Sequence, residues 1–232
     1  MKPICFIAAR GGSKGVPNKN LRRILNEPLI THTIRKAIRS RLFSHVVVST
    51  EDAKIRNVSK KAGAETPFWR PKELAVDDSS MSDVLLHGIN ELTSLDYDFD
   101  TIVLLDCTVP FLRVSDIAAT IKLLRKEKCD IVCGVYEQHL NPYFNITELN
   151  SRGYLRLAKN LKNKPQSRQK APKVYQLTGL YTFDVKKFLK NKKTFTKKVV
   201  PLVIPIESGV MIDTEFEFNV VKCLFKKYYR VN

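Results

Sequence analysis

Short apolar runs alternate with helical patterns over the first 135 residues, and this alternation constrains the fold more than any other feature. The strand-like runs occupy residues 4–8, 45–49, 101–105 and 131–135. Apolar residues recur at helical spacing within 26–43, 84–92 and 117–124. Such alternation favours an α/β fold, in which a mostly parallel sheet carries helices on both faces. We therefore predict a Rossmann-like sheet that binds its ligands at the carboxyl ends of the strands.

The pattern changes in residues 136–173, which are polar, basic and rich in Asn and Pro. The segment is too long for an ordinary loop, and insertions of this size are usually functional or pack on a partner. Strand patterns return at 176–183 and 199–205, and a last helix begins at Glu215 behind a capping-box spacing, Thr214 to Glu217. We predict one domain over 1–232, with 136–173 as an inserted subdomain shaped as a hairpin arm.

The composition limits the classes of function. The 232 residues are 44% hydrophobic, enough for one sizeable core, and no apolar window reaches the ~18 residues of a membrane span. Met1 leads almost directly into a strand, so we expect a cytoplasmic protein without a signal peptide. The net charge of +17 is densest in 155–173 and 186–198, which contain few aromatic residues and no nucleic-acid motif. The charge therefore favours an anionic nucleotide or sugar acid over a nucleic acid.

Residues 8–20 read A-A-R-G-G-S-K-G-V-P-N-K-N and follow the first strand directly. Glycines allow backbone N–H groups to turn towards an anion, and nearby cations add charge where phosphate oxygens would lie. The spacing matches neither the Walker loop nor the dinucleotide G-x-G-x-x-G. The segment is typical of a phosphate-binding loop; the alternative is a glycine turn with solvated lysines.

This loop resembles the signature of the acylneuraminate (CMP-sialic acid) cytidylyltransferase family. Further segments resemble other motifs of the family in the same order, at 69–77 (W-R-P-K-E-L-A-V-D), 105–113 (L-D-C-T-V-P-F-L-R), 168–172 (R-Q-K-A-P) and 212–215 (I-D-T-E). The resemblance implies a sheet of the nucleotide-diphospho-sugar transferase type. It also implies transfer of a cytidylyl group from CTP to the anomeric hydroxyl of an acidic nine-carbon sugar, with Mg²⁺ and release of pyrophosphate.

The resemblance assigns a nucleotide site to two loops. CTP would be bound by Arg10, Gly11, Gly12, Ser13, Lys14, Lys19, Asn20, Arg70 and Asp77. Arg10, Lys14 and Lys19 would act in catalysis together with Asp213, because displacement at phosphorus requires neutralised phosphate charge. For Arg70 the alternative is a surface ion pair, and for Asp77 it is an N-cap on the following helix.

Two departures from the family pattern concern the metal. Met211 stands where members of the family commonly carry the first Asp of D-I-D-T, and Asp106 stands where they carry Gln. Mg²⁺ takes oxygen ligands, which a thioether does not supply. Our hypothesis is that Asp106 and Asp213 together bind Mg²⁺. The alternatives are that Asp106 contacts the sugar or caps a turn, and that the missing carboxylate marks a weakly active homologue.

The acceptor side rests on fewer residues. By the resemblance, the sugar would contact Asp106, Thr108, Arg168, Gln169 and Tyr181, and an arginine suits a carboxylate through bidentate hydrogen bonds. Tyr181 lies one residue early against the family's strand motif, so the alternative is that it faces the core. The arm would form a homodimer and complete the sugar pocket of the partner. Two other functions stay open, activation of another acidic sugar such as an octulosonate and non-catalytic binding of a nucleotide or nucleic acid.

Overall fold

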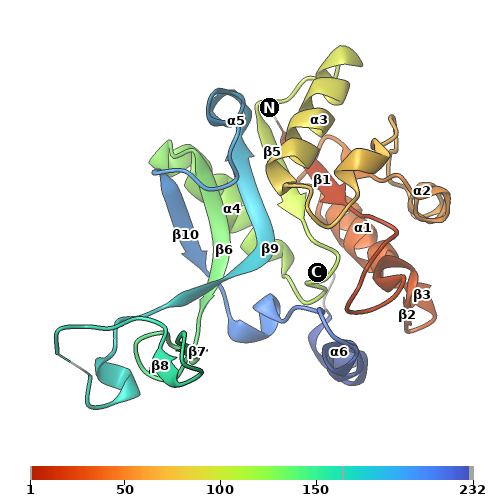
Figure 1. Ribbon diagram of the computed structural model, residues 1–232. Coiled ribbons are helices and arrows are strands. Elements are labelled where there is room, and N and C mark those ends of the chain that lie inside the picture. The colour runs from red at the N-terminus through yellow and green to blue at the C-terminus, as the bar shows by residue number, and fades with distance from the viewer. Residues whose placement is uncertain (1, 164, 230–232) are drawn as a thin grey trace.

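The computed structural model describes residues 2–163 and 165–229, and a six-stranded sheet forms its centre (Figure 1). The strand order is β10-β6-β9-β5-β1-β4. The strands are β1 (Ile4–Ala8), β4 (Val46–Ser49), β5 (Thr101–Leu105), β6 (Ile131–Glu137), β9 (Tyr175–Asp184) and β10 (Val199–Val203). The predicted α/β class with a mostly parallel sheet is confirmed.

One central strand departs from the parallel pattern. β9 pairs antiparallel with both β5 and β6, whereas the β1–β4, β1–β5 and β6–β10 pairs are parallel. The reason is the path of the chain, which leaves the carboxyl end of β6, builds the arm and re-enters the sheet from that same end. The returning strand must therefore run in the opposite direction.

Helices cover both faces of the sheet. They are α1 (Leu29–Ser40), α2 (Ala53–Lys61), α3 (Met81–Ser94), α4 (Val114–Glu127), α5 (Val185–Asn191) and α6 (Glu215–Tyr228). Because side chains alternate along a strand, Cys5 and Ile7 of β1 pack with α1, α2 and α4, while Ile4 and Phe6 pack with α3 and α5. The two apolar layers on the sheet form the core, and α6 closes a further cluster around Val16 and Phe225.

The first helix is shorter than the predicted 26–43. A hairpin of β2 (Arg23–Ile24) and β3 (Glu27–Pro28) precedes it, and the two residues at its turn, Leu25 and Asn26, have positive φ. Paired positive φ values are typical of the tight turns that join antiparallel strands. α1 therefore begins at Leu29, and its C-cap is Arg41 in the left-handed conformation. At the other end of the chain, the predicted capping box of Thr214 and Glu217 is confirmed.

The inserted segment projects from the end of the sheet as an arm (Figure 1). Its strands β7 (Thr147–Leu149) and β8 (Leu155–Leu157) pair with each other as an antiparallel hairpin. The segment contains this hairpin, and β6 continues two residues beyond Val135, into the predicted range of the arm. Residue 164 within the arm, and residues 1 and 230–232 of the predicted domain, lie outside the described residues. Within 2–163 and 165–229, no helix is both long and apolar enough to cross a membrane.

Candidate active site

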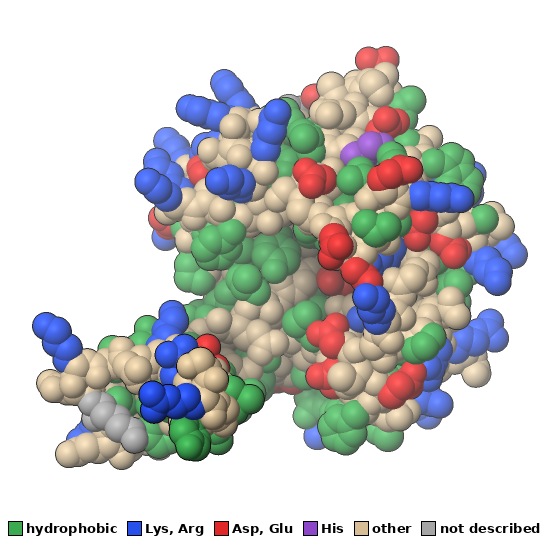
Figure 2. Space-filling view, viewed as in Figure 1, with side chains coloured by type: hydrophobic (Ala, Val, Ile, Leu, Met, Phe, Trp, Pro, Cys, Tyr) green, Lys and Arg blue, Asp and Glu red, His purple; other side chains and the backbone are tan. Residues whose placement is uncertain are grey.

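The candidate residues gather at the carboxyl ends of three neighbouring strands, β5, β1 and β4. The glycine-rich loop follows β1, Glu51 and Asp52 follow β4, and Asp106 follows β5. Residues 211–213, which precede α6, contact the loop, because Lys19 donates hydrogen bonds to Ile212 and Asp213. Figure 2 shows a hollow in the middle of this face, with hydrophobic side chains on one side and several carboxylates on the other. This is the edge at which parallel sheets bind ligands.

The loop after β1 is held by hydrogen bonds and by close packing. Asn20 Nδ2 donates to the Arg10 carbonyl oxygen at 3.0 Å, and Lys19 Nζ donates to the Ile212 carbonyl at 2.5 Å and to Asp213 Oδ1 at 3.2 Å. A Cβ on Gly15 would lie 2.0 Å from the Asp213 carbonyl oxygen, so only glycine permits this approach. A Cβ on Gly12 would meet nothing within 4 Å, so the loop is open at that position.

Two cations of the loop converge on one carboxylate. Arg10 Nη2 lies 2.7 Å and Lys14 Nζ 2.5 Å from the Asp77 carboxylate. Hydrogen bonds from Lys14 and then Arg10 hold the pKa of Asp77 below its ordinary value. The alternative that Asp77 caps the next helix is wrong, because Ser80 is the N-cap of α3 and accepts from the Asp83 N–H. The same two cations are able to receive phosphate oxygens.

Arg70 lies behind the loop. Its side chain is buried, Nη2 donates to the Ser49 carbonyl oxygen at 2.5 Å and Nε donates to Ser49 Oγ at 3.1 Å. Burial lowers the pKa of Arg70 to about 10. The alternative of a surface ion pair is therefore wrong, and the structure places this guanidinium against the end of β4.

Asp106 begins the turn after β5. Its Oδ1 accepts the Thr108 N–H at 2.9 Å, so the turn-capping alternative holds for one oxygen. Its own N–H donates to the Gly179 carbonyl at 2.8 Å, which ties the turn to β9. Thr108 is buried, and its Oγ1 has no hydrogen-bond partner within the described residues.

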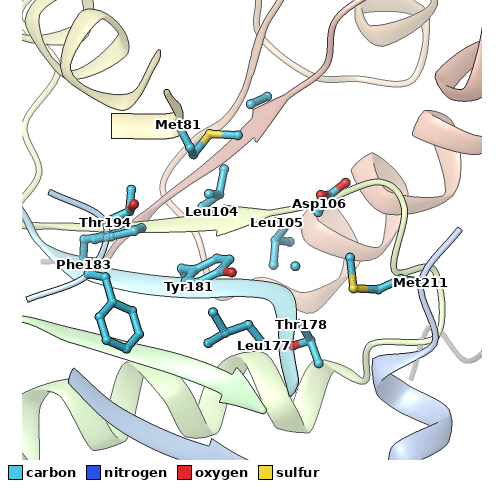
Figure 3. Close-up of a pocket in the computed structure, with 13 residues that line it drawn as sticks. Met81, Leu104, Leu105, Asp106, Leu177, Thr178, Tyr181, Phe183, Thr194 and Met211 are labelled. Atoms are coloured by element: carbon cyan, nitrogen blue, oxygen red, sulfur yellow. The ribbon is translucent and has the colours of Figure 1, made fainter. Parts of the chain in front are cut away.

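Asp106 also lines a cavity of about 300 Å³ whose walls are mostly apolar (Figure 3). The walls include Met81, Leu177, Thr178, Tyr181, Phe195 and Met211. Tyr181 is partly buried at this cavity, and its ring stacks on Phe183 at 6.2 Å, so its side chain faces both the cavity and the core. Burial raises the pKa of Tyr181 to about 12, and the phenol is therefore neutral at pH 7.

The residues present fit a magnesium ion only in part. Among the described residues, no group of three or more His, Cys, Asp or Glu side chains could hold a metal. Mg²⁺ is nevertheless commonly bound by one or two carboxylates together with substrate phosphates. Asp106 lines the cavity and the Asp213 side chain is 61% exposed, so both carboxylates are accessible beside the loop. Met211 lines the cavity with its thioether and supplies no oxygen.

Two predicted residues lie elsewhere in the chain. Arg168 and Gln169 lie on a 3₁₀ turn (Arg168–Lys170) of the arm, where they are exposed. They line a small hollow with Glu137 and Asn141, not the cavity of Asp106. A single chain therefore does not bring them together with the acceptor turn.

One contact of the loop was not predicted from the sequence. Glu51 Oε1 accepts the Gly11 N–H at 2.7 Å, which occupies the first amide of the glycine pair. The available signal was position, because Glu51 lies two residues after the end of β4, the strand that pairs with β1.

Comparisons with known proteins identify the family of the chain. A family model described as Cytidylyltransferase matches residues 4–215. The chain is 33% identical to CMP-N,N'-diacetyllegionaminic acid synthase from Campylobacter jejuni over 95% of this chain and 94% of that protein. It is 31% identical to Pseudaminic acid cytidylyltransferase from the same species, over 97% of each.

A solved structure shows the same fold. CMP:2-keto-3-deoxy-manno-octonic acid synthetase complexed with CTP superposes with a TM-score of 0.71 and 17% identity, covering 98% of this chain and 99% of that one. Because the family match spans nearly the whole chain and each of the two relatives exceeds 30% identity, the chain belongs to the cytidylyltransferase family.

Proposed function

We propose that this protein transfers CMP from CTP to the anomeric hydroxyl of a nonulosonic acid and releases pyrophosphate. The observation that carries the proposal is the placement of two different surfaces at one sheet edge. A cationic glycine loop follows β1, and an apolar cavity with one carboxylate, Asp106, opens beside it. Ala8, the last residue of β1, lines that cavity and leads into the loop. Relatives of similar length are named for N,N'-diacetyllegionaminic and pseudaminic acids.

The loop would bind the triphosphate of CTP. In this assignment the open backbone at Gly12 and Ser13 binds phosphate oxygens. Arg10 and Lys14 would leave their ion pairs with Asp77 and bind phosphate oxygens instead. Lys19 and Asn20 maintain the shape of the loop through Ile212 and Arg10. The chemistry is an in-line displacement, in which the sugar oxygen bonds to the α-phosphorus as the bond to pyrophosphate breaks. Charge neutralisation and alignment contribute most to such a reaction.

The metal proposed for this site is Mg²⁺, with Asp106 and Asp213 as its protein ligands. When bound, the ion would neutralise phosphate charge and orient the triphosphate. The observation in favour is that both carboxylates are accessible beside the loop. Lys19, 3.2 Å from Asp213, would fix that carboxylate in place.

The walls of the cavity favour an acylated sugar. Met81, Tyr181, Phe195 and Met211 offer apolar surface that suits the methyl groups of N-acyl substituents. An octulosonate has no such substituents and would leave these walls without partners. We therefore place a nonulosonic acid ahead of an octulosonate as the acceptor.

We propose that the protein is a homodimer in which the arm of each chain packs on its partner. Leu149, Tyr154 and Leu155 of the arm are each about two-thirds exposed or more, at 67%, 67% and 71%. Exposed apolar side chains grouped on one projection are typical of an interface. In such a dimer Arg168 and Gln169 would approach the acceptor cavity of the partner subunit and meet the carboxylate of the sugar.

Because CTP is supplied in the cytoplasm and all five cysteines are unpaired, we place the reaction in that reducing compartment.

The experiment is pyrophosphate release measured with CTP, Mg²⁺ and a panel of acidic sugars. The panel contains a sialic acid, a diacetamido nonulosonic acid of each available stereochemistry and an octulosonate. Turnover with a nonulosonic acid supports the proposal. Turnover with the octulosonate alone would identify an octulosonate, and not a nonulosonic acid, as the acceptor. Release with none of them, alongside salt-sensitive RNA binding, would favour a binding protein instead.

A further inference from the structure

A single peptide unit of the loop is held at both ends by side chains, one from the end of the loop itself and one from the segment after β4. The Arg10 carbonyl accepts from Asn20 Nδ2 at 3.0 Å, and the Gly11 N–H of the same peptide donates to Glu51 Oε1 at 2.7 Å. Asn20 is buried, with 8% of its surface exposed. The Arg10–Gly11 peptide cannot rotate without breaking both of these hydrogen bonds.

Glu51 is itself held between rigid elements. It follows β4, and the next residue, Asp52, is the N-cap of α2, where Oδ1 accepts from the Lys54 and Ile55 N–H groups at 2.7 and 2.9 Å. The second oxygen, Glu51 Oε2, is buried and has no hydrogen-bond partner within the described residues. The positive charge of buried Arg70 acts on the Glu51 carboxylate. A carboxylate so placed accepts a stronger hydrogen bond than a neutral group.

The placement of a carboxylate beside a phosphate-binding loop requires a reason, because it repels the ligand. Glu51 takes the Gly11 N–H, so that this amide is not available to a phosphate. The contact instead fixes the orientation of the Arg10 side chain and of the backbone that follows. The clamped peptide fixes the point from which the Arg10 side chain extends towards Asp77 at 2.7 Å, and it precedes the open backbone at Gly12. The Gly11 backbone also lies close to the Asp52 side chain, since a Cβ on Gly11 would lie 2.7 Å from Asp52 Oδ2.

We propose that Glu51 is a positioning residue for the nucleotide. By clamping the Arg10–Gly11 peptide together with Asn20, it aims the Arg10 guanidinium and the amides from Gly12 onward at the triphosphate of CTP. This inference rests on the proposed function.

The test is direct binding of CTP to the purified protein without sugar, measured by isothermal titration calorimetry. Glu51→Ala should raise the Kd for CTP at least about tenfold, which corresponds to ~1.4 kcal/mol and to one hydrogen bond to a charged group. Glu51→Gln retains an acceptor oxygen for the Gly11 N–H and should stay within about threefold of the wild type. In turnover, Glu51→Ala should raise KM for CTP by the same factor and leave kcat at saturating CTP within about threefold.

Asp184→Ala is the matched control. It also removes a helix N-cap carboxylate, on α5, and Asp184 pairs with Thr101 at the end of β5 away from the loop. It should lower Tm, but should leave the Kd for CTP within about twofold. A wild-type Kd in Glu51→Ala would overturn the inference. So would equal losses of affinity in Glu51→Gln or in Asp184→Ala, because the effect would then come from charge or from general stability.

Hydrogen exchange separates this inference from the proposed function. The Gly11 amide should exchange faster in Glu51→Ala than in the wild type, and at the wild-type rate in Glu51→Gln, with no ligand present. If the wild type fails to bind CTP, the proposed function is wrong, while exchange still tests the clamp. Unchanged exchange of Gly11 in Glu51→Ala would overturn it.

Discussion

Gly179→Ala tests how tightly the acceptor turn is packed against β9. A Cβ at this position would lie 2.2 Å from the Asp106 Cβ and 2.9 Å from Val109 Cγ2. Non-bonded carbon atoms are stable at about 3.5–4.0 Å, so the Asp106 side chain and its backbone must move by about 1 Å. The Gly179 carbonyl also accepts the Asp106 N–H at 2.8 Å, which couples the two segments.

The expected magnitude follows from this displacement. Overpacking costs about 1–3 kcal/mol, less than the ~5–15 kcal/mol that stabilise an ordinary domain, so Gly179→Ala should fold. A shift of about 1 Å in a group that aligns the reaction costs on the order of a hundredfold in rate. We therefore expect kcat/KM for pyrophosphate release to fall about a hundredfold. The Kd for CTP should stay within about threefold, because the loop is anchored on Glu51 and Asn20 instead.

The assay compares Gly179→Ala with Gly88→Ala. In the control a Cβ would lie 2.4 Å from Phe6 Cε2, in the core layer between α3 and the sheet. It should also lower Tm, although the better helix propensity of alanine offsets part of the loss. Its kcat/KM should stay within about threefold of the wild type. Equal losses of kcat/KM in both variants would refute the argument that the position of Asp106 determines the rate. A wild-type kcat/KM in Gly179→Ala would refute it as well.

Three further predictions address the metal, the core and the arm. Asp106→Asn keeps an acceptor for the turn but loses the charge, so kcat should fall about a hundredfold and the Mg²⁺ requirement should rise; wild-type rate and Mg²⁺ dependence would exclude Asp106 as a ligand. Burial lowers the pKa of Lys36, which donates to the Pro110 and Leu112 carbonyls, to about 7. The unfolded chain, with a lysine pKa of about 10.4, then binds more protons than the folded one between pH 7 and 10, so wild-type stability relative to Lys36→Met should rise over that range by up to about 1.4 kcal/mol per pH unit. Urea unfolding at pH 7 and 9 checks this, and a difference that does not change with pH contradicts it. Leu155→Arg places a charge on the exposed arm and should convert the dimer to monomer in light scattering; a wild type that is already monomeric at micromolar concentration would refute the interface.

The periodic features of the sequence predicted the framework well. Apolar runs placed the strands and their order along the chain, because burial in a sheet requires such runs. The glycines and cations of residues 8–20 indicated the phosphate-binding loop. The spacing of Thr214 and Glu217 indicated the N-terminus of the last helix, α6. These features are local, so each can be predicted without knowledge of distant residues.

The features that could not be predicted depend on contacts between distant segments. The direction of β9 follows from the route of the arm, which no periodicity records. The burial of Arg70 depends on the end of β4, 21 positions away. The role of Glu51 as a partner of Gly11 depends on two strands lying side by side. Residue types at single positions do not specify such pairings.

The most direct test of the central claim is identification of the product. The protein is incubated with CTP, Mg²⁺ and the nonulosonic acid that it turns over fastest. The products are then separated and identified by mass spectrometry. The account predicts a sugar joined to CMP and pyrophosphate in a one-to-one ratio, and neither product without the sugar. Hydrolysis of CTP to CMP or CDP, with no sugar-linked product from any acid in the panel, would contradict it.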